Sequence, residues 1–78
     1  MISIDEIKQM IIKNETEWLK ETHPENTNQM YIDGMIDEIN DCKDIDDIAI
    51  FYGNRGYKVI EAYECIICIL RENTQVKY

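Results

Sequence analysis

A pair of cysteines, Cys65 and Cys68, stands two isoleucines apart and is the first candidate for chemistry. This spacing occurs in zinc sites and in thiol–disulfide redox motifs. A structural zinc site needs four ligands, and only Cys42 and His23 are left to complete one. A redox motif favours an exposed, turn-forming middle pair at a strand-to-helix junction. Because the pair lies in the most apolar run of the chain, we expect buried, reduced, structural thiols and no metal or cofactor.

Three other patterns that could support catalysis or ligand binding fail on their spacing. His23 is the only histidine, and no Ser or Cys nucleophile can be assigned to it by spacing. The acidic cluster that begins at Asp44 has Ile48 and Ala49 where a calcium-binding EF-hand loop needs an oxygen ligand and a glycine. The segment 53–56 is too short for a phosphate-binding glycine loop, and no Lys-Thr or Lys-Ser pair follows it. The sequence therefore predicts no catalytic residues and no enzyme.

An acidic block between residues 25 and 47 is the feature that remains. It holds eight acids and one base, a net charge of −7, while the whole chain carries −8. A localised negative surface attracts basic surfaces and repels nucleic acid and anionic membranes. We therefore expect the partner to be a basic protein surface, with no direct contact with nucleic acid or membrane. The residues that we assign to partner binding are Asp33, Asp37, Glu38, Asp41, Asp44, Asp46 and Asp47.

Three of these aspartates, Asp33, Asp37 and Asp41, recur every four residues and so share one helix face. No Lys or Arg stands four residues from any of them to form a pair. The helical rise between them is about 6 Å, similar to the distance between successive phosphates along one nucleic-acid strand. Such a row can occupy a groove that evolved for a phosphate backbone, where Arg and Lys would donate charge-assisted hydrogen bonds to it. The alternative interpretation is a solvated face that confers only solubility.

The elements that position these residues are predicted to be helices, because three Gly and one Pro leave long stretches without helix breakers. Ser3 and Glu6 form a capping box, which predicts a first helix that ends near Thr22, before Pro24. A second helix is expected over residues 28–43. A third, short helix should begin after the N-cap Asp44 and end at the turn 53–56.

The last segment, residues 57–73, is rich in the β-branched and aromatic residues that favour strands. Its length and its apolar spacing indicate a helix instead. Two of its faces are apolar, so we expect either a central helix of the fold or one partly buried in an oligomer. The face assigned to the core contains Ile60, Tyr63, Ile67 and Leu70, and the face assigned to an oligomer interface contains Cys65, Ile66 and Ile69.

Together these patterns predict a single acidic helical domain over residues 1–78, an all-α fold built as a compact small bundle of three longer helices and one short helix. No signal peptide or membrane span is visible, so we expect a cytoplasmic protein. Small size, high negative charge and the lack of catalytic residues are shared with phage-encoded inhibitors of host defence, including many anti-CRISPR proteins. This is a similarity of kind, without a shared motif.

The expected function is that of a non-enzymatic inhibitor that binds a basic, nucleic-acid-handling protein, with nucleic-acid mimicry as its mechanism. The alternative is a homo-oligomeric helical adaptor or regulatory subunit, a homodimer in the simplest case, assembled through the apolar last helix.

Overall fold

The computed structural model describes residues 2–26 and 28–73, and within them all regular structure is helical. The helices are α1 (Ile4–Thr22), α2 (Gln29–Asn40), α3 (Ile45–Gly53) and α4 (Val59–Asn73), and a 3-10 turn, η1 (Pro24–Asn26), follows α1. Three of the helices have 19, 12 and 15 residues, and α3 has 9. The all-α prediction is confirmed.

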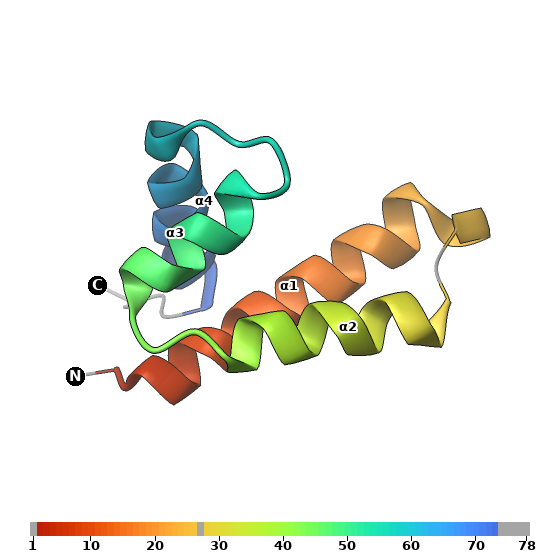
Figure 1. Ribbon diagram of the computed structural model, residues 1–78, viewed down its shortest axis with the longest axis horizontal. Helices are drawn as coiled ribbons and strands as arrows, with labels where there is room; N and C mark the ends of the chain where they lie inside the picture. The colour runs from red at the N-terminus through yellow and green to blue at the C-terminus, as the bar shows by residue number, and fades with distance from the viewer. Residues whose placement is uncertain (1, 27, 74–78) are drawn as a thin grey trace.

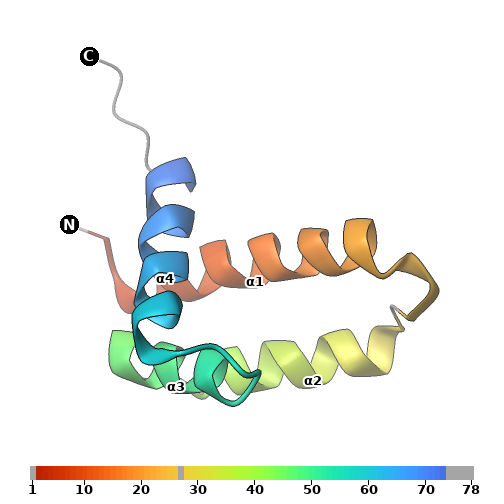
Figure 2. The same ribbon diagram turned by 90° about the horizontal axis from the view of Figure 1, so that it is seen from above.

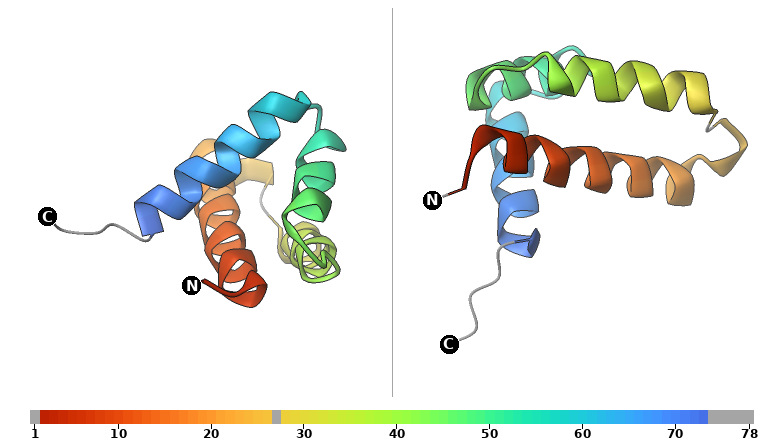
Figure 3. Two further views of the ribbon diagram at one scale, coloured as in Figure 1. Left: turned by 90° about the vertical axis from the view of Figure 1, so that its left-hand side faces the viewer. Right: turned by 90° about the horizontal axis from the view of Figure 1, so that it is seen from below.

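An antiparallel hairpin of α1 and α2 forms the long part of the molecule, and α3 and α4 pack at one end of it (Figure 1). α1 contacts α2 and α4, and α3 contacts α4 and α2. α4 crosses α1 at a steep angle near the N-terminal half of α1 (Figure 3). The connecting end of the hairpin extends beyond α3 and α4 (Figure 2). The contacts between helices therefore support the predicted bundle in part.

The hydrophobic core lies where the four helices meet. Its large side chains with less than 2 % exposure are Tyr52, Ile11, Ile39, Ile48 and Ile66, which come from all four helices. Burying one aliphatic side chain of this size stabilises the fold by about 1.5–3 kcal/mol. This cluster therefore fixes how the pair α3–α4 is held against the hairpin.

The N-caps predicted for the first and third helices are confirmed. The Ser3 Oγ accepts a hydrogen bond from the Glu6 backbone N–H at 3.2 Å, and the Ser3 hydroxyl donates to the Glu6 carboxylate at 3.2 Å. The Asp44 carboxylate accepts from the Asp47 backbone N–H at 2.9 Å. The bonds to the Glu6 and Asp47 N–H groups satisfy donors that have no partner inside their own helix.

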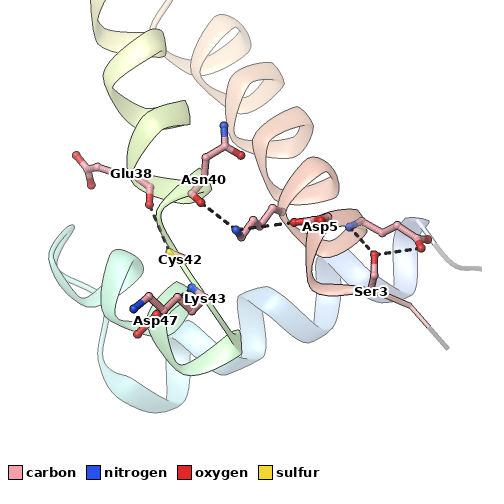
Figure 4. A network of polar contacts seen from close by, with 9 residues as sticks. Ser3, Asp5, Glu38, Asn40, Cys42, Lys43 and Asp47 are labelled. Atoms are coloured by element: carbon pink, nitrogen blue, oxygen red, sulfur yellow. Dashed lines mark hydrogen bonds and ion pairs between the residues drawn. The ribbon is translucent and has the colours of Figure 1, made fainter.

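α2 is shorter than predicted, since it ends at Asn40 and leaves Cys42 and Lys43 in the linker to α3 (Figure 4). The Lys43 backbone N–H donates to the Asp47 carboxylate of α3 at 2.9 Å and so is not available to continue α2. The Lys8 ammonium of α1 donates to the Asn40 carbonyl at 2.9 Å. A basic side chain from another helix therefore caps the C-terminus of α2 and complements its dipole.

α4 begins at Val59, two residues later than predicted, because a tight turn precedes it. Gly56 in that turn has a φ of 95°, in the left-handed region that glycine adopts without strain. The Lys58 backbone N–H then donates to the Glu61 carboxylate at 2.8 Å, which caps the first turn of α4. The helix, and not the strand that the composition favours, is the observed structure of this segment.

The apolar faces of α4 are the reverse of the prediction. Ile66 and Ile69 are only 1 % and 5 % exposed and lie in the core together with Ala62. Ile67 and Ile60, assigned to the core from the sequence, are 49 % and 71 % exposed. At 100° per residue, positions 62, 66 and 69 share the side that meets α1 and α3, whereas 60 and 67 lie on another side.

This placement corrects the oligomer interface proposed from the sequence. The Ile66 and Ile69 side chains are covered by their own chain, so they cannot contact a second folded copy. Cys65 lies beside them and is only partly exposed. Tyr63 and Leu70, assigned to the core face, are partly buried.

Candidate functional site

The solvent side of α2 carries the row of aspartates that the sequence indicated. Asp33, Asp37 and Asp41 are exposed and lie opposite the buried side that includes Met35 and Ile39. Asp41 is the C-cap residue, and its backbone N–H still donates to the Asp37 carbonyl at 3.0 Å, so the row continues to the end of the helix. We call these three residues the acidic row.

The side chains of the acidic row make few contacts with the rest of the described chain. The Gln29 side-chain amide donates to the Asp33 carboxylate at 2.8 Å. No hydrogen bond or ion pair from residues 2–26 and 28–73 reaches the side chains of Asp37 and Asp41. Two carboxylates four residues apart therefore face solvent without a cation.

Glu38, also assigned to partner binding, is paired inside the chain. The Arg55 guanidinium donates to the Glu38 carboxylate at 3.0 Å and lies 4.0 Å over the centre of the Phe51 ring. The Glu38 side chain is half exposed, so the ion pair contributes at most about 1 kcal/mol. The pair nevertheless reduces the negative charge that Glu38 offers to a partner.

The other three candidates, Asp44, Asp46 and Asp47, act at the start of α3. Asp44 is its N-cap, and the Asp47 carboxylate accepts from the Lys43 backbone N–H at 2.9 Å. The Asp46 carboxylate accepts from the Tyr63 hydroxyl at 2.6 Å, which raises the pKa of Tyr63 because the phenol donates to a carboxylate. These contacts join α3 to the linker and to α4. Of the seven predicted residues, the acidic row forms one surface on α2, and its side chains form no hydrogen bond or ion pair with another helix in the described residues.

A second acidic site, which the sequence analysis did not identify, lies between α1 and α4. It is an open groove of about 470 Å³. Glu61, Glu64 and Glu72 of α4 and Glu15 of α1 line it, and none of its described lining residues is Lys, Arg or His. We call this site the α1–α4 groove. Two signals were present in the sequence: the helical spacing of the three glutamates, and the interruption of the apolar pattern of α1 at Glu15.

Two aromatic side chains also line the α1–α4 groove. Trp18 is 48 % exposed, and its ring forms a T-shaped pair with the His23 ring at a centroid distance of 5.4 Å. Tyr57 is 38 % exposed, and its ring lies 5.2 Å from the Tyr52 ring of the core. Carboxylates next to exposed aromatic faces favour a cation with an apolar part and disfavour an anion.

Beneath this groove a partly buried carboxylate meets a buried phenol. Burial raises the pKa of Glu15, and this is only partly opposed by the Asn14 amide, which donates to the carboxylate at 3.3 Å. Tyr52 is 1 % exposed, and its hydroxyl is close enough to Glu15 to influence its titration but forms no hydrogen bond of ordinary geometry with any described residue. Burial, followed by the charge of Glu15, raises the pKa of Tyr52. An unpaired buried hydroxyl costs about 1–3 kcal/mol.

Replacing Glu15 with Gln is expected to stabilise the protein at neutral pH. A carboxyl whose pKa is raised in the folded state favours folding only while it is protonated, so stability falls as pH rises above the ordinary pKa of 4.5. Gln cannot ionise, so the Tm of the variant should exceed that of the wild type at pH 7. The difference should be much smaller near pH 4, where Glu15 is mostly protonated in both states. Glu17→Gln, an exposed neighbour on α1, is the control. An equal gain at both pH values would contradict the prediction.

The three cysteines differ in accessibility. The prediction of two buried thiols is wrong for Cys68 and only partly right for Cys65. Cys42 is buried, Cys65 is intermediate and Cys68 is exposed. Cys68 is not a buried thiol because α4 turns Ile66 and Ile69 toward the core and leaves Cys68 on the groove side. Burial raises the pKa of both Cys42 and Cys65. In the part of the chain that the structure describes, no three His, Cys, Asp or Glu side chains are close enough to hold a metal ion.

Comparison of the chain with protein-family models, with curated proteins and with solved structures finds no match. Within residues 2–26 and 28–73, no helix has both the length and the apolar character that a membrane span requires. The acidic row and the α1–α4 groove are therefore the two features from which function is inferred.

Proposed function

We propose that the protein is a non-enzymatic inhibitor that acts in the cytoplasm by binding a basic, nucleic-acid-handling protein through the acidic row. The observation that supports this function is the exposure of Asp37 and Asp41 without a cation among the described residues. Like charges four residues apart on a helix repel by a few tenths of a kcal/mol. A basic partner surface would relieve this repulsion and turn it into attraction.

Nucleic-acid mimicry is the mechanism that the spacing of the row supports. Successive carboxylates are about 6 Å apart along the helix axis, a pitch similar to that of phosphates along one strand. Arg and Lys side chains that bind a phosphate backbone can donate charge-assisted hydrogen bonds to carboxylates at the same pitch. The inhibitor would then compete directly with nucleic acid for one groove of the partner.

Gly34, within α2 and next to the acidic row, gives the proposal further support. A Cβ at this position would meet no atom of the described residues within 4 Å apart from its own stretch of helix, so packing among them does not require glycine here. Glycine in a helix costs about 1 kcal/mol relative to Ala. A partner surface that approaches the helix closely between Asp33 and Asp37 would explain why position 34 is a glycine.

Capture followed by competition tests the proposed function. The protein is immobilised and exposed to a bacterial lysate, and retained proteins are eluted with salt, because contacts between exposed charges weaken as ionic strength rises. Each retained protein is purified and its binding to nucleic acid is measured with increasing amounts of the inhibitor. We expect a nucleic-acid-binding protein that releases its nucleic acid. Simultaneous binding of nucleic acid and inhibitor, or no retained nucleic-acid-binding protein, would contradict the proposal.

The alternative function, a homo-oligomeric adaptor or regulatory subunit, is favoured by a different surface from the one predicted. Ile50, Val59, Ile60 and Ile67 are exposed apolar residues on α3 and α4. The molar mass in solution at low and at high salt separates the two functions. A stable oligomer at both salt concentrations would favour the adaptor.

A further inference from the structure

We propose that the α1–α4 groove is a binding site for the guanidinium group of an arginine side chain on the basic partner. This inference rests on the proposed function and adds a second contact to it, on a surface separate from the acidic row. Residues of both helices line the groove, and those from α1 belong to its C-terminal half. The two helices cross each other at a steep angle (Figure 3).

The charge of the groove selects a cation. Glu15 stands on its α1 side and Glu61, Glu64 and Glu72 stand on its α4 side, with no basic side chain among the described lining residues. The nearby Arg55 is engaged with Glu38 at 3.0 Å. Because no three potential metal ligands of the described chain converge on one point, the carboxylates surround the groove and do not form a metal site. A larger organic cation that reaches several of them fits this arrangement.

The aromatic walls select an arginine over a compact ammonium ion. Trp18 and Tyr57 are both partly exposed at the groove. A guanidinium group is planar and weakly hydrated, and it stacks on aromatic rings while its edge donates to carboxylates. The apolar stem of the same side chain can lie against Ile69 and Cys65, which also line the groove.

The buried Tyr52 hydroxyl interacts with Glu15, one of the residues that line the groove. Tyr52 is 1 % exposed and its ring packs on Tyr57, a wall of the groove. Among the described residues, no hydrogen bond of ordinary geometry reaches this hydroxyl. A guanidinium that donates to Glu15 would favour its ionised form, and an ionised carboxylate is a stronger acceptor for the phenol O–H. Ligand binding would thus strengthen the interaction between Tyr52 and Glu15.

Trp18 provides a local readout, since it is the only tryptophan in the chain. The protein is titrated with N-acetyl-arginine amide into the millimolar range at constant ionic strength, and tryptophan emission is recorded. N-acetyl-citrulline amide, which is neutral and nearly the same shape, is the control for charge. We expect a saturable change with the arginine probe and none with the citrulline probe. No saturation with arginine, or equal binding of both probes, would overturn the proposal.

Two further experiments identify the source of the cation and the residues that bind it. Spermidine represents a free polyamine, and if it binds more tightly than the arginine probe, the assignment to an arginine side chain is wrong. Glu61→Gln combined with Glu64→Gln should weaken arginine binding about three- to tenfold, because each removes one partly exposed charge pair. Asp37→Asn on the acidic row should leave the titration unchanged. Unaltered binding by the double variant would also overturn the proposal.

The titration needs no partner protein, so its failure is distinguishable from failure of the proposed function. Saturable arginine binding without capture of any nucleic-acid-binding protein would reject the proposed function and support the groove as a guanidinium site. Capture and competition through the acidic row, with Trp18 emission unchanged by arginine, would support the function and reject the groove.

Discussion

Ile66→Asp is expected to unfold the protein at room temperature, whereas Ile67→Asp should leave it folded. Ile66 is 1 % exposed in the core, so the substitution buries an unpaired carboxylate and removes an aliphatic side chain. The loss should exceed about 4 kcal/mol. A domain of 78 residues has a total stability on the order of 4–12 kcal/mol. Its small core places it near the lower end of that range, so the loss removes most of the stability. Far-UV circular dichroism and a thermal melt measure the effect.

The contrast between neighbouring positions makes this a test of the orientation of α4. Ile67 is 49 % exposed, so its aspartate can stay hydrated and should cost no more than about 1 kcal/mol, mostly in helix propensity. Ile66→Val, which removes one methylene from the core, should cost about 0.5–1.5 kcal/mol and shows that the site tolerates a conservative change. Equal melting temperatures for Ile66→Asp and Ile67→Asp would mean that the buried side of α4 is wrongly assigned.

The starts of the helices were predictable because their signals are local. Ser3 and Asp44 bond to backbone N–H groups three residues further on, so a window of four residues contains the whole interaction. The end of α2 was not predictable in this way. It depends on Lys8 of α1 and on Asp47 of α3, which approach the end of α2 only in the folded protein.

The buried side of α4 could not be derived from periodicity, because apolar residues occur on most of its circumference. When Ile60, Ile66, Ile67 and Ile69 are all apolar, the helical pattern predicts that some side is buried but not which one. The packing of α4 against α1 and α3 determines which side of α4 is buried. There Ala62, which is fully buried, lets the helices approach closely.

The two candidate sites also differ in how far the sequence predicts them. The exposure of Asp33, Asp37 and Asp41 followed from helical spacing within one element, and the structure places all three on the solvent side. The α1–α4 groove combines Glu15 with residues more than forty positions later in the chain. The α1 part and the α4 part of the groove each had a signal in the sequence. Only the folded structure, in which the two helices meet, shows that they form one site.

Charge reversal of the acidic row should abolish partner binding without loss of stability. In Asp37→Lys combined with Asp41→Lys, the net charge changes from −8 to −4. Both positions lie at the C-terminal end of α2, where the helix dipole disfavours acids and favours bases by about 0.3–1 kcal/mol each. The Tm should therefore stay the same or rise. Binding to a basic surface should weaken by about hundredfold or more, since like charges placed together at an interface cost several kcal/mol.

A matched control separates the acidic row from net charge alone. Glu17 and Glu21 are exposed, stand four residues apart on α1, and give the same change of net charge when both are replaced by Lys. If the acidic row is the binding surface, this control should weaken binding only slightly, through loss of long-range attraction that salt screens. Equal losses in the two variants at physiological salt would show that the partner responds to total charge. In that case the regular spacing of Asp33, Asp37 and Asp41 would have no part in recognition, and mimicry of a phosphate backbone would be wrong even if a basic partner exists.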